Sequence, residues 1–272
     1  MSDGRLVVAV SNPASVDPLI RMGSALARTK NGSLTVTSVT ELPTQIPVTA
    51  EDEHGTQQEA IIERALSVAD SLGVPAEGRA PPSHNPSRAI VSVVENEDAA
   101  GLLVGASELI PFEESLLRPT SLERIIEHVS CDVYVERIGP TPAVPADSIL
   151  VPTANGAYAD SVIEVAADIG RECDMHVHIV TVPSPAADVQ TIERIEQRLR
   201  TSLPSEMATT SEVSVIPGES VVETLVEMTG EHDMTVLGAT EDSTLRQLLS
   251  GTVPAGLAKR GRNTLLLVAN SN

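Results

Sequence analysis

The sequence repeats itself, and this internal repeat restricts the possible folds more than any other feature. Near the start of each half, a gapless block recurs 143 positions later, so that Asp17 matches Asp160. Near the end of each half, a second block recurs 133 positions later, and there Gly105 matches Gly238. Self-similarity over half of a chain indicates two copies of one structural unit.

The two copies are predicted to be two domains of ordinary size. We place the first domain at residues 1–138 and the second at residues 146–272. The segment that joins them, Ile138–Pro145, is rich in proline, as linkers often are. The first copy is longer in its middle, where it carries an insertion around Pro43–Gln57.

Each copy alternates short apolar runs with helical patterns. The predicted strands are residues 5–10, 33–40, 75–80, 100–104 and 132–136 in the first copy, and 148–152, 176–182, 211–216, 234–237 and 264–269 in the second. The predicted helices are residues 16–30, 57–72, 87–96, 121–129, 158–173, 189–203, 219–231 and 252–260. Apolar strands separated by helices predict an α/β fold, a doubly wound parallel sheet covered on both faces. Such sheets bind ligands beyond the carboxyl ends of their strands.

The clearest motif lies near the end of the second copy, between a short apolar strand and a helix start. Gly238 closes the strand, and a polar loop then leads to Gly251 and Thr252. Thr252 has the chemistry of a helix N-cap, and Pro254 stands where a missing N–H costs least. The free amides of such a helix start favour an anion, so the motif predicts a phosphate-sized site.

Charge and composition argue against nucleic acid as a partner. The formal net charge is −20, and aromatic residues make up only 1% of the chain. Nucleic acid binding needs clustered basic side chains, and recognition of single strands usually needs aromatic stacking. Acidic residues spread along the chain instead indicate a solvated surface adapted to high salt, as in proteins of halophiles.

The remaining composition favours a cytoplasmic protein. Two cysteines, Cys131 and Cys173, fit a reduced compartment better than a disulfide scaffold. No apolar run approaches the roughly 18 residues of a membrane span, and the first residues do not resemble a secretory signal. We therefore expect no insertion into a membrane.

The motif of the second copy resembles that of the universal stress protein family. Nucleotide-binding members carry a glycine, two residues, a second glycine, nine residues, and then Gly-Ser or Gly-Thr. Here Gly238 and the pair Gly251-Thr252 match, whereas Glu241 stands at the middle glycine. The resemblance covers nearly the whole chain as two tandem copies. It implies two five-stranded domains, similar to adenine nucleotide alpha hydrolases, packed as a pseudo-dimer that could pair further into a homodimer.

The resemblance also implies a site for ATP or AMP in the second copy. The implied contacts are Pro152, Thr153, Val182, Leu237, Gly238, Glu241, Gly251, Thr252 and Val253. Where ATP-binding relatives have an aspartate near the base, this chain has Ala154 or Asn155. A carboxylate of Glu241 about 4 Å from a phosphate would repel it by roughly 4 kcal/mol. A bound Mg²⁺ could reverse that repulsion, because it binds both kinds of oxygen.

The first copy departs further from the motif. Gly105 and Glu108 keep its beginning, but Arg118 and Pro119 replace the Gly-Thr pair. The arginine could still pair with a phosphate through its side chain. We prefer the alternative, a structural copy without a ligand.

The histidines offer weaker signals. Cys173, His176 and His178 have a spacing that could seat a metal, because alternate residues of a strand share a face. In a covered sheet, packed or hydrogen-bonded histidines are the preferred interpretation, and we predict no metal site. His84 and His232 are solitary loop residues without a recognisable partner. No catalytic motif occurs, so we do not expect an enzyme.

Two functions of different classes follow. The first is a regulatory universal stress protein whose second copy binds an adenine nucleotide, weakly or with a metal. The second is an interaction scaffold without a nucleotide, such as the soluble regulatory partner of a membrane transporter. The departures from the motif at Glu241, Glu108 and Arg118 favour this second function. Nucleotide hydrolysis would rest on analogy of fold alone.

Overall fold

The structure is a computed structural model of the chain. It describes residues 4–43, 45, 56–106, 121–140, 146–153, 159–183, 186–203, 211–238 and 252–269. The chain divides into two compact units, and the main division falls between Val135 and Glu136, within the last strand of the first sheet.

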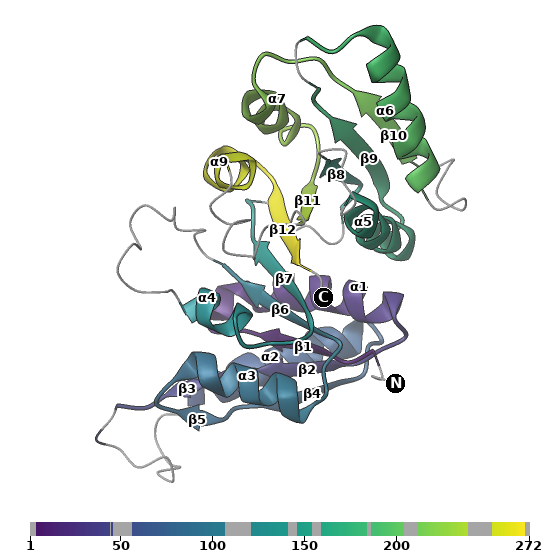
Figure 1. The fold of residues 1–272 in the computed structure, drawn as a ribbon. Coiled ribbons are helices and arrows are strands. Elements are labelled where there is room, and N and C mark those ends of the chain that lie inside the picture. Colours follow the sequence, from purple (N-terminus) through teal and green to yellow (C-terminus); the bar gives the residue numbers. More distant parts are fainter. Residues whose placement is uncertain are drawn as a thin grey trace. The chain divides into compact units, whose positions relative to one another are not determined.

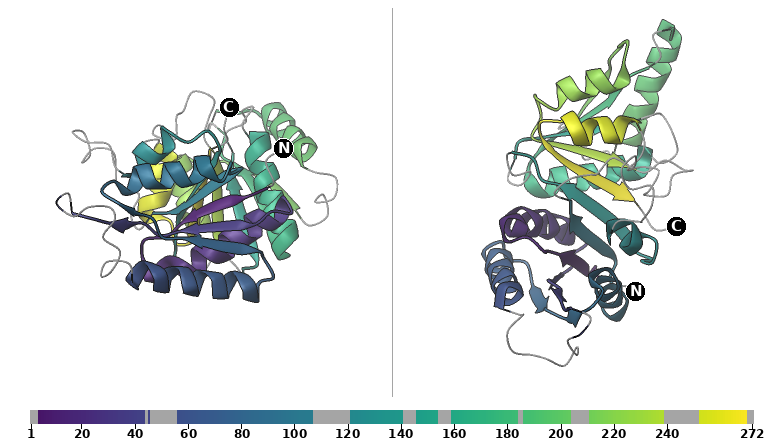
Figure 2. Two further views of the ribbon diagram at one scale, coloured as in Figure 1. Left: turned by 90° about the horizontal axis from the view of Figure 1, so that it is seen from below. Right: turned by 90° about the vertical axis from the view of Figure 1, so that its left-hand side faces the viewer.

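The first unit contains a five-stranded sheet with helices on both faces (Figures 1 and 2). Its strands are β1 (Leu6–Ala9), β2 (Leu34–Thr37), β4 (Ala76–Arg79), β6 (Gly101–Gly105) and β7 (Asp132–Arg137), in the spatial order β7-β6-β1-β2-β4. Its helices are α1 (Val16–Thr29), α2 (Thr56–Ser71), α3 (Pro86–Asn96) and α4 (Ser121–Ile126). Helices α1 and α2 pack together, as do α3 and α4.

The second unit repeats this arrangement. Its strands are β8 (Ser148–Pro152), β9 (His176–Thr181), β10 (Ser211–Val215), β11 (Met234–Gly238) and β12 (Thr264–Ala269), in the order β10-β9-β8-β11-β12. Its helices are α5 (Ala159–Cys173), α6 (Val189–Ser202), α7 (Val221–Met228) and α9 (Thr252–Arg260). In Figure 1, α5 and α6 lie on one side of the strands, and α7 and α9 lie on the other.

Both sheets have the same strand order, which confirms the predicted doubly wound α/β fold. The neighbouring pairs β1–β2, β1–β6, β8–β9 and β11–β12 are parallel. Every predicted strand and helix is present. Among the described residues, three short elements were not predicted: the 3-10 turn η1 (Pro13–Ser15) and the two-residue strands β3 (Thr40–Glu41) and β5 (Pro82–Ser83).

Helix starts are set by short polar side chains. Asn85 accepts a hydrogen bond from the amide of Arg88 at the start of α3, and Asp188 accepts one from the amide of Thr191 in α6. Such caps satisfy amides that have no partner within the helix. They therefore fix where these two helices begin.

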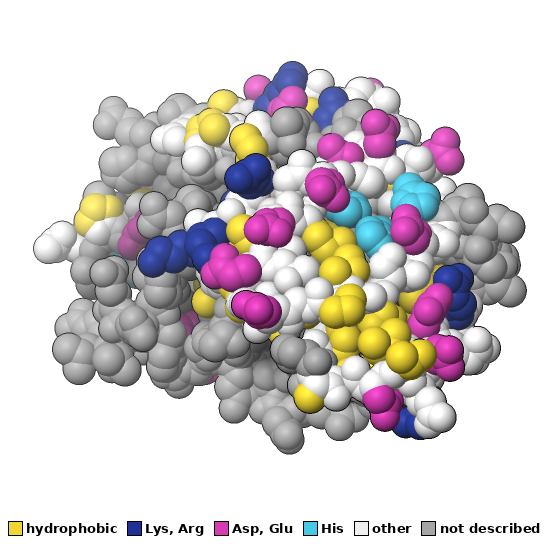
Figure 3. Space-filling model, turned by 90° about the horizontal axis from the view of Figure 1, so that it is seen from above, with side chains coloured by type: hydrophobic (Ala, Val, Ile, Leu, Met, Phe, Trp, Pro, Cys, Tyr) yellow, Lys and Arg dark blue, Asp and Glu magenta, His cyan; other side chains and the backbone are white. Residues whose placement is uncertain are grey.

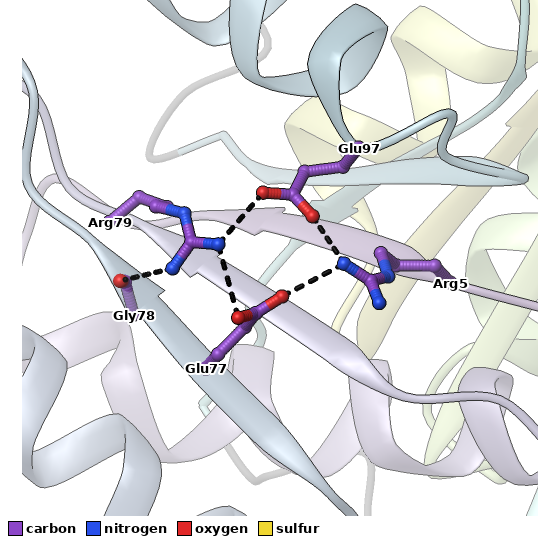
Figure 4. Close-up of polar contacts among 5 residues, drawn as sticks. All are labelled: Arg5, Glu77, Gly78, Arg79 and Glu97. Atoms are coloured by element: carbon purple, nitrogen blue, oxygen red, sulfur yellow. Dashed lines mark hydrogen bonds and ion pairs between the residues drawn. The ribbon is translucent and has the colours of Figure 1, made fainter.

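Four alternating charges form a ring in the first unit (Figure 4). Arg5 pairs with Glu77 at 2.8 Å and also with Glu97. Arg79 pairs with the same two carboxylates, at 3.0 Å and 3.1 Å. The ring joins residues on β4 to the start of β1 and to the end of α3. Because the Glu97 side chain is only 12% exposed, its contacts are less screened than those of an ordinary surface pair.

The ring predicts that Glu97→Gln destabilises the first unit. The substitution leaves two arginines with one carboxylate between them, and we expect a loss of about 1–3 kcal/mol. Urea unfolding in high salt measures the change. Glu95→Gln is the matched control, since Glu95 is an exposed residue of the same helix that makes no ion pair within the described residues. Equal stability of the two variants would show that the ring contributes nothing.

Glu136 on β7 is a carboxyl group outside this ring, and it is fully buried. Among the described residues, neither of its carboxylate oxygens has a hydrogen-bond partner. Burial raises the pKa of Glu136 to about 8, because water no longer stabilises the charged form. The folded protein therefore holds a proton that the unfolded chain, with an ordinary pKa of 4.5 for this group, releases at lower pH.

This difference predicts a pH-dependent stability that Glu136→Gln removes. Between about pH 4.5 and pH 8 the unfolded state binds fewer protons, so this group lowers stability by up to about 1.4 kcal/mol for each unit of rising pH. Above pH 8 its effect levels off. Urea midpoints from pH 5 to pH 8.5 should therefore slope less in the variant than in the parent protein. An unchanged slope would mean that Glu136 ionises normally in the fold.

Candidate nucleotide site

The predicted site lies where the strand order of the second sheet reverses. Strand β8 pairs with β9 on one side and with β11 on the other, although β11 follows much later in the chain. Pro152 at the end of β8 is opposite Val180, and the amide of Thr153 donates to the carbonyl of Val180 at 2.8 Å. In doubly wound sheets in general, the loops at such a position diverge to opposite faces, and ligands bind between them.

The other predicted strand residues end at the same edge. Val182 directly follows β9, and Gly238 ends β11 opposite Val268 of β12. Leu237 is 5% exposed, so its side chain belongs to the core and only its backbone could contact a ligand. Pro152, Thr153, Val182, Leu237 and Gly238 are thus brought to one edge of one sheet.

The start of α9 belongs to this edge as well. Strands β11 and β12 are parallel, so the helix between them must run back along the sheet. Its first residues, Thr252 and Val253, therefore lie at the carboxyl ends of the strands. The first turn of α9 contains no acidic side chain, whereas those of α5 and α7 contain Asp160 and Glu223. The positive end of this helix dipole is not offset by the helix's own side chains.

Several predicted site residues lie outside the described residues. These are Glu241 and Gly251 in the second copy, with Ala154, Asn155 and the side chain of Thr252, and Glu108, Arg118 and Pro119 in the first. The roles assigned to them stay predictions.

Gly238 has a packing role that the motif did not indicate. A Cβ atom at this position would lie 1.9 Å from Cγ2 of Val162 on α5. A Cβ at the equivalent Gly105 would lie 2.9 Å from Cδ1 of Leu19, and Leu19 occupies the place of Val162 in the first copy. Because both copies have the contact, close packing of helix on strand is sufficient to explain the glycine.

This contact predicts that Gly238→Ala destabilises the second unit by about 1–3 kcal/mol, the usual cost of overpacking. Trimming the opposing side chain should relieve the clash, so the double variant Gly238→Ala/Val162→Ala should be more stable than the two single effects would give together. Urea unfolding of the four proteins measures this coupling. Strictly additive effects would contradict the packing role.

The histidines are arranged differently from the prediction. His176 is exposed, and among the described residues no group of three or more His, Cys, Asp or Glu side chains could hold a metal ion. The prediction that His232 is solitary is wrong, because its Nε2 lies 3.1 Å from Nδ1 of His178. His84 also has a partner, since its Nδ1 lies 3.1 Å from the carbonyl oxygen of Leu42. The His178–His232 pair had no signal in the sequence, because its members are far apart in the chain.

Comparison with known proteins agrees with the fold. Residues 4–137, which make up the first copy, match the universal stress protein family. No curated protein matches the chain. No helix among the described residues is long and apolar enough to cross a membrane.

Solved structures match both copies together. A universal stress protein from Archaeoglobus fulgidus has a TM-score of 0.69 at 14% identity, over 98% of this chain and 97% of that one. A putative universal stress protein from Pseudomonas aeruginosa has a TM-score of 0.64 at 12% identity, over 99% and 94%. At these identities the similarity shows the fold. A shorter universal stress protein, solved with cAMP, is 26% identical over 46% of this chain and 98% of its own, with a TM-score of 0.40.

Proposed function

We propose that the chain is a tandem universal stress protein that binds an adenine nucleotide at the carboxyl edge of its second sheet. The observation that carries this proposal is the meeting of three strand ends and one helix start at the point where the strand order reverses. The family match in the first copy supports extending the family to the repeated second copy.

The geometry suits the phosphate end of a nucleotide better than its base. Backbone amides at the start of α9 can donate hydrogen bonds, and the dipole adds about 0.3–1 kcal/mol for a negative charge. Among the described residues, no aromatic side chain lies at the ends of β8, β9 and β11 to stack on a base. We therefore expect modest affinity, with Mg²⁺ joining the phosphates to Glu241.

The protein's charge indicates the conditions for this function. A net charge of −20 destabilises a compact fold at low salt, because the like charges repel one another, and added salt screens that repulsion. We infer a cytoplasmic protein of a salt-rich cell. Binding would serve regulation rather than turnover, and the absence of ATP hydrolysis with Mg²⁺ in molar salt would agree with this role.

A thermal shift experiment tests the proposal directly. A ligand that binds only the folded state raises the melting temperature, by an amount set by its concentration relative to Kd. The protein is melted in molar salt with ATP, AMP or cAMP, with and without Mg²⁺. We expect at least one nucleotide to stabilise it, and the triphosphate to depend most on Mg²⁺.

Thr252→Ala locates the site. Loss of one hydroxyl contact to a phosphate should weaken binding about tenfold, measured by calorimetry. Ser121→Ala, at the start of α4 in the first copy, is the matched control and should leave affinity unchanged. Unchanged affinity in Thr252→Ala would remove the second copy as the site, and no stabilisation by any nucleotide would remove the function.

An interaction scaffold is the alternative, and one observation favours it. Gly238, the first residue of the nucleotide motif, is explained in both copies by packing against the first helix. The glycine would then persist without any ligand, and the surface would bind a protein such as the soluble face of a transporter. A nucleotide that stays bound through purification and is detected by mass spectrometry would exclude this alternative.

A further inference from the structure

Two imidazoles meet on the second unit, apart from the strand ends of the nucleotide site. His178 is the third residue of β9, and His232 lies in the turn between α7 and β11. Their ring centres are 5.2 Å apart, and the facing nitrogens, Nδ1 of His178 and Nε2 of His232, are separated by 3.1 Å. In Figure 3, histidine side chains lie together on the surface with carboxylates beside them.

The far nitrogen of each ring is held by a fixed partner. Nδ1 of His232 lies 2.9 Å from the carbonyl oxygen of Met228, which can only accept, so this nitrogen carries a proton. Nε2 of His232 then carries only a lone pair, which accepts a hydrogen bond from the Nδ1–H of His178. Nε2 of His178 lies 2.9 Å from Oγ of Ser214, and that hydroxyl lies 3.3 Å from Oε1 of Glu212.

We propose that His178 and His232 chelate one transition-metal ion of the zinc, copper or nickel class. Zinc–imidazole bonds of about 2.0–2.1 Å place two nitrogens about 3.3 Å apart in a tetrahedral site and about 2.9 Å apart at a right angle. The observed separation of 3.1 Å falls between these values. Borderline ions of this class prefer imidazole, whereas Mg²⁺ and Ca²⁺ prefer oxygen ligands.

The outer partners match those of metal-bound histidines. A ligating imidazole usually donates its other N–H to a carbonyl, a carboxylate or a water, which fixes the tautomer. His232 already does so through Met228. In His178 the ring proton moves from Nδ1 to Nε2, which donates to Ser214, and the hydroxyl proton of Ser214 turns toward Glu212. The charge of the pair is unchanged, and both facing nitrogens become available to the metal.

Neighbouring residues also hold both histidines in position. The side-chain amide of Asn263 donates to the carbonyl oxygen of His232 at 3.1 Å and bonds Thr235 on β11. His178 belongs to a strand with partners on both sides, β8 and β10. Two ligands on a rigid support lose little freedom on binding, and water completes the coordination.

Zinc titration of tag-free protein tests the proposal. We expect one Zn²⁺ per chain by calorimetry in molar NaCl, and tighter binding of Cu²⁺ in line with the general order of metal affinities. His178→Gln and His232→Gln should each weaken binding at least tenfold. His84→Gln and His128→Gln are the matched controls and should bind as the parent does, because each of those rings lies against a single backbone carbonyl.

A third variant covers the case in which a histidine substitution disturbs folding. Ser214→Ala keeps both rings and should lower zinc affinity about tenfold, the usual effect of losing an outer partner. The electron paramagnetic resonance spectrum of bound Cu²⁺ should show coupling to two imidazole nitrogens in the parent. Absence of saturable binding, or equal binding by the parent and both histidine variants, would overturn the site.

Discussion

Close packing of helices on sheets whose buried side chains are almost all aliphatic is the constraint on which both units depend. The chain has 1% aromatic residues, so apolar burial comes from Val, Leu, Ile, Ala and Met. Strand residues such as Val8 and Leu150 are fully buried. Glycine allows the helix backbone to approach: a Cβ at Gly23 of α1 would lie 2.8 Å from Val8, and one at Gly238 would lie 1.9 Å from Val162. Small side chains at these points set the spacing of the layers.

The sequence was sufficient for this architecture because its main signal, the apolar strand pattern, is local and occurs in both copies. Apolar runs such as residues 264–269 mark strands that are buried on both faces, and the repeat doubles the evidence for each. The two-residue strands β3 and β5 were not predicted, because two residues are too few to show an alternating or apolar pattern. Helix ends were less accurate: residues 219–231 were predicted, but α7 begins after its cap Ser220 and ends before Thr229, whose hydroxyl bonds the carbonyl of Val226.

The edge of the candidate site could be predicted because parallel strands bring their carboxyl ends together, whatever their separation in the chain. The histidine pair could not, since it depends on where a turn places one side chain. His178 and His232 meet only because β9 lies beside β8 and because the turn after α7 holds His232 against Met228. Likewise, the packing role of Gly238 depends on the position of α5 over β11, which no pattern in the sequence indicates. The sequence motif alone therefore could not distinguish a glycine required for packing from a glycine required for ligand binding.

Affinity for a nucleotide depends on charges within a few ångströms of the phosphates. In molar salt the screening length is about 3 Å, so most of the net charge of −20 does not act on a bound anion. The dipole of α9 favours the anion by about 0.3–1 kcal/mol. A carboxylate of Glu241 about 4 Å from a phosphate opposes it by roughly 4 kcal/mol. Screening in molar salt lowers that repulsion to about 1 kcal/mol, which is comparable with the dipole contribution. Under the proposed function, a divalent cation between Glu241 and the phosphates would remove this remaining repulsion.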